Sequence, residues 1–115
     1  MNFEELLTAL NASGYPFVAH GWNAEPELPV WGVLALDAGG SAQWAGDRQT
    51  DQAVAVSIDV WARSDVGSVF EAVQAVLRES GLPWRFVDGV YDSGRRALHF
   101  AWGAVLLEVW PDGNA

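Results

Sequence analysis

Cysteine and lysine are absent from the 115-residue sequence, and histidine occurs only twice. Without cysteine, the chain can form neither a disulfide framework nor a metal site with thiolate ligands. Without lysine, it cannot carry the Gly-x4-Gly-Lys loop that binds phosphate groups. His20 and His99 lie far apart in the sequence, and neither has a second ligand at the spacing of a metal site. We therefore predict no metal, no cofactor and no catalytic residue, and we expect that the protein is not an enzyme.

Positive charge and long apolar runs are also scarce. Six arginines face 15 acidic residues, which gives a formal net charge of −9. Such a surface repels nucleic acid and anionic lipid unless positive charge is concentrated locally, and the pair Arg95-Arg96 is too small for a DNA-binding footprint. No apolar run reaches the length of a membrane span, and the acidic start lacks the basic flank of a signal peptide. We expect a soluble intracellular protein that makes no membrane contact.

What the sequence does contain is enough apolar residues for one folded domain, spanning residues 1–115. Two amphipathic segments predict helices. The first, at about residues 2–12, begins with a capping box formed by Asn2 and Glu5. The second follows Asp65, or Ser64 before it, and ends at a Gly-Leu-Pro turn.

Alternating apolar residues predict the strands, which we place at 15–22, 30–37, 53–61, 84–92 and about 97–110. In the last of these the alternation shifts phase at Gly103-Ala104, which predicts a β-bulge there. Helices separated from hairpin-connected strands are typical of an α+β fold. We therefore predict an antiparallel or mixed sheet of four or five strands, with both helices packed on one face.

Seven tryptophans are an unusually large number for a chain of this length. Trp102 has the phase of a core residue, but Trp61 lies opposite the aliphatic row of its strand and Trp110 lies near the end of the chain. Trp44 lies in the long connection 38–51, and long connections in compact domains tend to be functional or mobile. Exposed tryptophans are typical anchors of protein–protein contacts.

Asp59 shares the face of Trp61, so we expect this face to meet either a neighbouring subunit or another sheet. The residues predicted to form a subunit or partner interface are Trp44, Asp47, Arg48, Asp59, Trp61 and Trp110. RNA-type stacking would also use aromatic side chains, but it needs interleaved basic residues that this acidic chain lacks.

The segment AVSIDVWARSDVGSVFEAVQAVLRESGLPW, residues 55–84, resembles the tail terminator proteins of long-tailed bacteriophages, also called tail-completion or minor tail proteins. Relatives occur in prophages and gene-transfer agents. The shared features are a strand of the form V-x-I-D-V-W, a short polar link, an amphipathic helix, a Gly-x-Pro turn and two further strands. In order of elements, the resemblance covers most of residues 1–110.

The resemblance implies a single tail-terminator-like domain that assembles with itself into a hexameric ring. Such a ring lies on the head-proximal end of the tail tube, ends tube polymerisation and offers a surface for head–tail joining. The implied partners are the tail tube protein and the head–tail connector or neck protein, and DNA passes through the ring without specific binding. The implied location is the tail or neck of the virion, and the host cytoplasm during assembly.

A second hypothesis remains open. A small acidic α+β binding module, such as a chaperone or immunity-type protein, would cover a single protein partner. Adjacent capsid and tail genes would favour the terminator, whereas adjacent secretion or toxin genes would favour the binding module. An enzyme is a third and weaker hypothesis, which a pocket gathering His20 or His99 with carboxylates would support.

Overall fold

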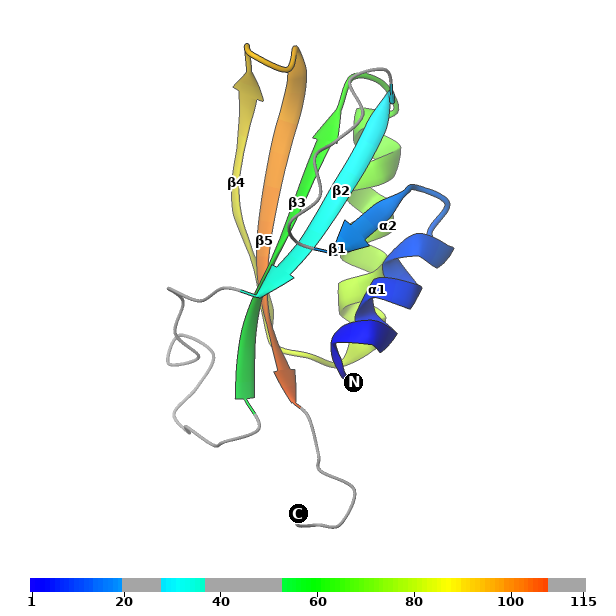
Figure 1. The fold of residues 1–115 in the computed structure, drawn as a ribbon, viewed down its shortest axis with the longest axis vertical. Helices are drawn as coiled ribbons and strands as arrows, with labels where there is room; N and C mark the ends of the chain where they lie inside the picture. The colour runs from blue at the N-terminus through cyan, green and yellow to red at the C-terminus, as the bar shows by residue number, and fades with distance from the viewer. Residues whose placement is uncertain (20–27, 37–52, 108–115) are drawn as a thin grey trace.

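The computed structural model describes residues 1–19, 28–36 and 53–107 (Figure 1). Within these residues the chain forms two helices and five strands, in the order α1 (Phe3–Ala12), β1 (Phe17–Ala19), β2 (Val30–Leu36), β3 (Ala53–Ala62), α2 (Val66–Ser80), β4 (Trp84–Asp92) and β5 (Ala97–Leu107). The predicted helices and strands are therefore present. The predicted loop 38–51 and the outer ends of the strands predicted at 15–22 and 97–110 lie outside the described residues.

The five strands form one mixed sheet in the order β1-β2-β3-β5-β4. β1 runs parallel to β2, and the other neighbouring strands are antiparallel. Both helices lie against the same face of this sheet (Figure 1). The predicted α+β class, with a mixed sheet and two helices on one face, is confirmed.

The hydrophobic core lies between the helices and the covered face of the sheet. α1 contributes Leu6 and Leu10, and α2 contributes three buried residues at helical spacing. From the strands, the fully buried side chains include Leu34, Val56, Ile58, Val60, Trp102 and Leu106. The aliphatic row predicted in β3 is thus the part of the sheet on which the helices pack.

Local signals set the helix ends. The Asn2 side chain accepts a hydrogen bond from the Glu5 backbone N–H at 2.8 Å, and the Glu5 carboxylate accepts from the Asn2 N–H at 2.9 Å. The predicted capping box is therefore confirmed. Asp65 is the N-cap residue of α2, but it has a left-handed backbone with φ of 54° and its side chain makes no capping hydrogen bond. Gly81 ends α2 with φ of 75°, a conformation that glycine adopts without steric cost.

The predicted β-bulge at Gly103-Ala104 is wrong. β5 pairs with β3 without a shift from Leu98 to Leu107, so Ala104 and Leu106 continue the helix-covered face after Trp102. The phase shift in the sequence arises because Val105, on the opposite face, is also buried. The register shift in this part of the sheet lies in β4, between Phe86 and Asp88.

One glycine is required by close packing within the sheet. The ring of Phe17, in β1, lies directly over Gly32 in β2, and a Cβ atom at Gly32 would run into that ring. Because Gly32 has no side chain, the short strand β1 can pack Phe17 against β2 and cover the core at this edge of the sheet.

Candidate functional site

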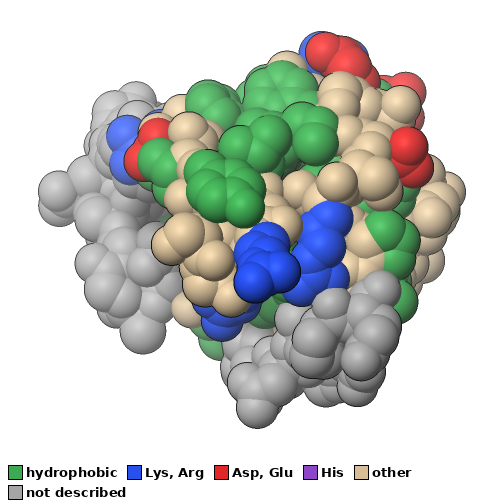
Figure 2. All heavy atoms as spheres, turned by 90° about the horizontal axis from the view of Figure 1, so that it is seen from above, with side chains coloured by type: hydrophobic (Ala, Val, Ile, Leu, Met, Phe, Trp, Pro, Cys, Tyr) green, Lys and Arg blue, Asp and Glu red, His purple; other side chains and the backbone are tan. Residues whose placement is uncertain are grey.

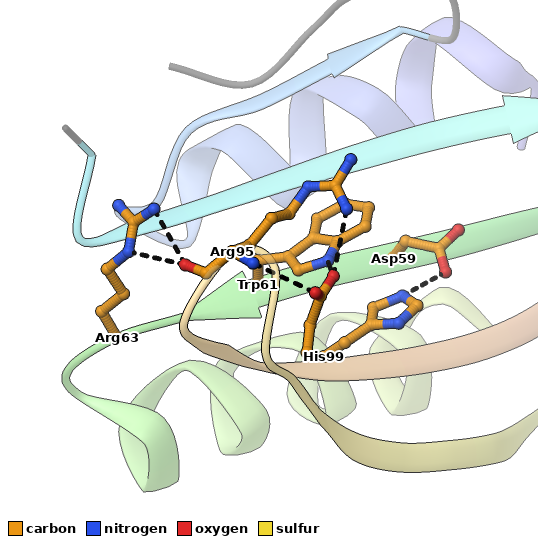
Figure 3. A network of polar contacts seen from close by, with 6 residues as sticks. Asp59, Trp61, Arg63, Arg95 and His99 are labelled. Carbon is orange, nitrogen blue, oxygen red and sulfur yellow. Dashed lines mark hydrogen bonds and ion pairs between the residues drawn. The ribbon is translucent and has the colours of Figure 1, made fainter. Parts of the chain in front are cut away.

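Asp59 and Trp61 lie on the sheet face opposite the helices, which we call the second face (Figure 3). The pairing of strands places Trp31 of β2 and His99 of β5 on either side of Trp61. The ring of Trp61 stacks on His99 with centroids 4.5 Å apart, and on Trp31 with centroids 5.9 Å apart. The alternation of β3 predicted the face of Trp61 correctly, but not its two aromatic neighbours.

Asp59 has a partner on the second face. Its Oδ1 lies 2.8 Å from Nε2 of His99, and each of the two side chains is about a quarter exposed, at 26% and 27%. The two residues come from adjacent strands. Asp59 of β3 lies directly opposite Ala101 of β5, and His99 is two residues before Ala101 on the same face. This pair orients the imidazole ring parallel to Trp61.

The turn between β4 and β5 also contacts Trp61. The indole Nε1 of Trp61 donates to Oδ2 of Asp92 at 3.2 Å, and Nη1 of Arg95 lies 3.0 Å from the same oxygen. The Arg95 guanidinium also lies 5.2 Å from the centroid of the Trp61 ring (Figure 3). The Arg95 backbone N–H, then the Arg95 side chain and the Trp61 indole, hold the pKa of Asp92 below its ordinary value, against the effect of burial.

A second arginine ties this turn to β2. Nε and Nη2 of Arg63 donate to the carbonyl oxygen of Arg95 at 3.2 and 3.0 Å, and Nη1 donates to the carbonyl of Leu28 at 2.8 Å. Its guanidinium lies 4.7 Å from the centroid of the Trp31 ring. Trp31 itself is 2% exposed, and its Nε1 has no hydrogen-bond partner within the part of the chain that the structure describes.

The polar side chains of this network therefore form hydrogen bonds and ion pairs with one another. Each of Asp59, His99, Asp92 and Arg95 has a partner within the chain. We call these contacts the clamp, because they join β2, β3, β5 and the turn after β4.

A different part of the surface carries exposed apolar side chains. β4 lies at the edge of the sheet, and its exposed apolar residues are Phe86 at 42%, Val87 at 54%, Val90 at 49% and Tyr91 at 61%. Seen from above, hydrophobic side chains gather into a patch at this end of the molecule, next to arginine side chains (Figure 2). This surface was not predicted from the sequence, because the residues of a strand do not show where the strand lies in the order of the sheet.

An aromatic cluster supports the inner side of this patch. Phe70 of α2 contacts Phe86 of β4 and Phe100 of β5 edge to face, with centroids 5.4 and 5.2 Å apart. Phe86 also meets the buried Trp102 at 5.6 Å. Phe86 is thus held in place by the core while a large part of its side chain faces solvent, which is the condition of a preformed contact residue.

A hollow of about 510 Å³ lies between the helices and is lined mostly by small side chains, among them Ala9, Ala12, Ala72 and Ala75. Neither His99 nor a carboxylate pair lies in it. Among the described residues, no group of three or more histidine, aspartate or glutamate side chains could hold a metal ion.

The predicted interface residues have different outcomes. Asp59 and Trp61 lie together on the second face, whereas Trp44, Asp47, Arg48 and Trp110 lie outside the described residues. Their role as an interface stays a prediction.

In the described part of the chain, neither helix has the length and apolar character needed to cross a membrane. A scan against known protein families and a search of curated proteins each find no match.

Proposed function

We propose that this protein is a structural assembly protein of a bacteriophage or prophage tail. In this role it forms a ring at the head-proximal end of the tail tube, ends tube polymerisation and provides the surface for head–tail joining. The observation that carries the proposal is the exposed apolar edge strand β4 on a small α+β domain whose polar clusters are satisfied internally. Such a surface favours a protein that acts through contacts with other chains.

The tail role itself comes from the order of elements. The strand V-x-I-D-V-W is β3, the polar link precedes α2, and two antiparallel strands follow the Gly-x-Pro turn. This is the sequence of elements on which the resemblance to tail terminators was based. The proposed partners are further copies of the same chain, in a hexamer, together with the tail tube protein and the head–tail connector or neck protein.

The charge of the chain suits this role. Each copy carries a formal charge of −9, so a ring of six copies would be strongly acidic. A negative lumen would repel the DNA backbone, and DNA could pass through without specific binding. The proposed locations are the tail or neck of the virion, and the host cytoplasm during assembly.

The direct test uses a tail tube protein, which the proposal expects to be encoded beside this gene. Purified tube protein is polymerised with and without this protein, and tube lengths and tube ends are recorded by electron microscopy. We expect shorter tubes that carry a ring at one end only. An unrelated acidic protein of similar size is the control. Tubes of unchanged length with bare ends would contradict the proposal.

The binding-module hypothesis rests on the same edge strand. An open strand edge can accept an extended segment of another protein, which adds a strand to the sheet. In that case β4 would hold one partner and no ring would form. Co-expression with the products of adjacent genes distinguishes the two functions, because a single stable one-to-one complex with a secretion or toxin protein is expected only from the binding module.

A further inference from the structure

β4 is the longer of the two edge strands of the sheet. It spans nine residues and, among the residues that the structure describes, pairs only with β5, whereas the opposite edge is formed by the three-residue strand β1. An exposed edge offers unpaired backbone N–H and C=O groups to another strand. The side chains that flank this edge are apolar to a large extent, so its surface favours contact with a protein.

The sequence of β4 is nearly self-complementary when it is read outward from Gly89. On one side lie Val90, Tyr91 and Asp92. On the other side lie Asp88, Val87, Phe86 and Arg85, which is one residue more. The register shift between Phe86 and Asp88 removes this difference, because Val87 and Asp88 together take up one position along the strand. Gly89 then has the same number of positions on each side.

This symmetry matters if a second β4 lies antiparallel to the first, with Gly89 opposite Gly89. Phe86 then lies opposite Tyr91 of the second copy, and Arg85 lies opposite its Asp92. Phe86 and Tyr91 are both on the helix-covered side, opposite Trp102 and Leu98 of β5. Arg85 and Asp92 are both on the second face, opposite Gly103 and Ala97. Aromatic pairs and opposite charges directly across two strands stabilise a sheet.

We propose that β4 pairs antiparallel with β4 of a second copy of this chain, about a two-fold axis through Gly89, so that two five-stranded sheets become continuous. Each half of the contact then contains one aromatic pair and the contact of Val90 with Val87. Arg85 lies across from Asp92, but the Asp92 carboxylate is already held by Trp61 and Arg95 of its own chain, so this position adds little to the contact. Gly89 lets the two backbones approach at the centre. Packing within the chain also favours glycine at this position, because a Cβ atom there would lie 3.1 Å from the ring of Phe100.

Asp88 is the charged residue of β4 that has no counterpart in this arrangement. Its Oδ1 accepts a hydrogen bond from the Gly89 N–H at 2.7 Å, and pairing exchanges this bond for one between the two strands. Bulges and charges on edge strands are devices that discourage pairing. Asp88 therefore weakens the contact, and Asp88→Ala should raise the dimer fraction several-fold at a given concentration.

The inference uses the same β4 edge as the proposed tail role, but it does not depend on that role. A two-fold contact closes on two copies, whereas a ring requires a heterologous contact between different surfaces of neighbouring copies. The two proposals can therefore fail separately. A single strand pair also falls at the small end of interface sizes, so we expect dissociation at concentrations on the order of 10 µM.

The absence of cysteine from the chain allows a clean test of the register. Phe86→Cys and Tyr91→Cys are made as separate variants, one of them with a mass tag. Both side chains are exposed, at 42% and 61%, and Phe86→Cys also loses the ring contacts of Phe86 with Phe70 and Trp102. Residues directly opposite in an antiparallel pair have Cα atoms about 4.5–5.5 Å apart, which a disulfide can span. In the proposed register, each cysteine lies four positions, about 13 Å, from its own copy in the partner, which is too far.

Mild oxidation of the mixture should therefore give a mixed disulfide dimer, at least tenfold more abundant than the dimer from either variant alone. Far-UV circular dichroism of each variant establishes that it is folded. Equal cross-linking in the mixture and in the separate variants would overturn the register. Absence of cross-linking in the mixture, together with a monomeric wild type at about 100 µM in sedimentation velocity, well above the expected dissociation constant, would overturn the pairing altogether.

Discussion

The second face of the sheet and the outer edge of β4 are two surfaces that the helices do not cover, and they differ in how their side chains are satisfied. On the second face, Trp61 is stacked on both sides and its N–H is bonded to Asp92. On the edge, Tyr91 is 61% exposed and Val87 is 54% exposed. An unusual cluster of polar and aromatic residues can therefore be structural, whereas a plain apolar strand can be the surface that meets a partner.

The largest effect on stability is expected from the replacement of Trp31. It tests whether the second face contributes to the stability of the fold. Trp31 is 2% exposed and packs under Arg63 and against Trp61. Trp31→Ala should lower the free energy of unfolding by about 3–5 kcal/mol, as for other buried tryptophans. Urea denaturation measures this. Leu36→Ala, at a residue that is 52% exposed, is the control and should change stability by less than about 0.5 kcal/mol.

A smaller effect is expected when only the hydrogen bond of Trp61 is removed. Trp61→Phe keeps an aromatic ring between Trp31 and His99 but leaves Asp92 without the indole donor. The loss should be about 1 kcal/mol, the usual net contribution of one hydrogen bond. A double-mutant cycle with Asp92→Ala, which removes the acceptor, measures the coupling of the two residues. Strictly additive effects would show that this contact adds nothing to the clamp.

The pH dependence of stability provides a finer comparison. The pKa of Asp92 is lowered in the folded chain, mainly by the Arg95 backbone N–H, so its charged form favours folding. This contribution is present above the ordinary pKa of about 3.9 and is lost as the pH falls through the lower pKa of the folded state. Asp92→Asn should therefore be less stable than wild type at pH 7, and the difference should shrink in acid. A difference that is constant from pH 7 to pH 2 would contradict this.

The features that could be predicted from the sequence are those set by neighbours along the chain. The capping box at Asn2, the glycine that ends α2 and the alternation of β3 all depend on contacts within a few residues. The aliphatic row of β3 then placed Asp59 and Trp61 on the correct face. These elements were enough to predict the fold class.

The features that could not be predicted depend on the order of strands. β5 lies between β3 and β4, so His99 and not a residue of β4 became the neighbour of Trp61. The same order left β4 at an edge. The misplaced bulge has a packing cause, since Val105 is buried on the second face and Ala104 is too small to mark the covered face in the sequence.

We propose that this protein associates through the β4 edge and not through the second face. Sedimentation velocity over a range of concentrations tests it most directly, with Tyr91→Ser as the edge variant and Trp61→Phe as the second-face variant. Tyr91→Ser should unfold at nearly the same urea concentration as wild type, because the side chain is exposed, yet it should lose most of its dimer. Trp61→Phe should be less stable but should dimerise as wild type does. Loss of association in Trp61→Phe, with association retained in Tyr91→Ser, would contradict the claim.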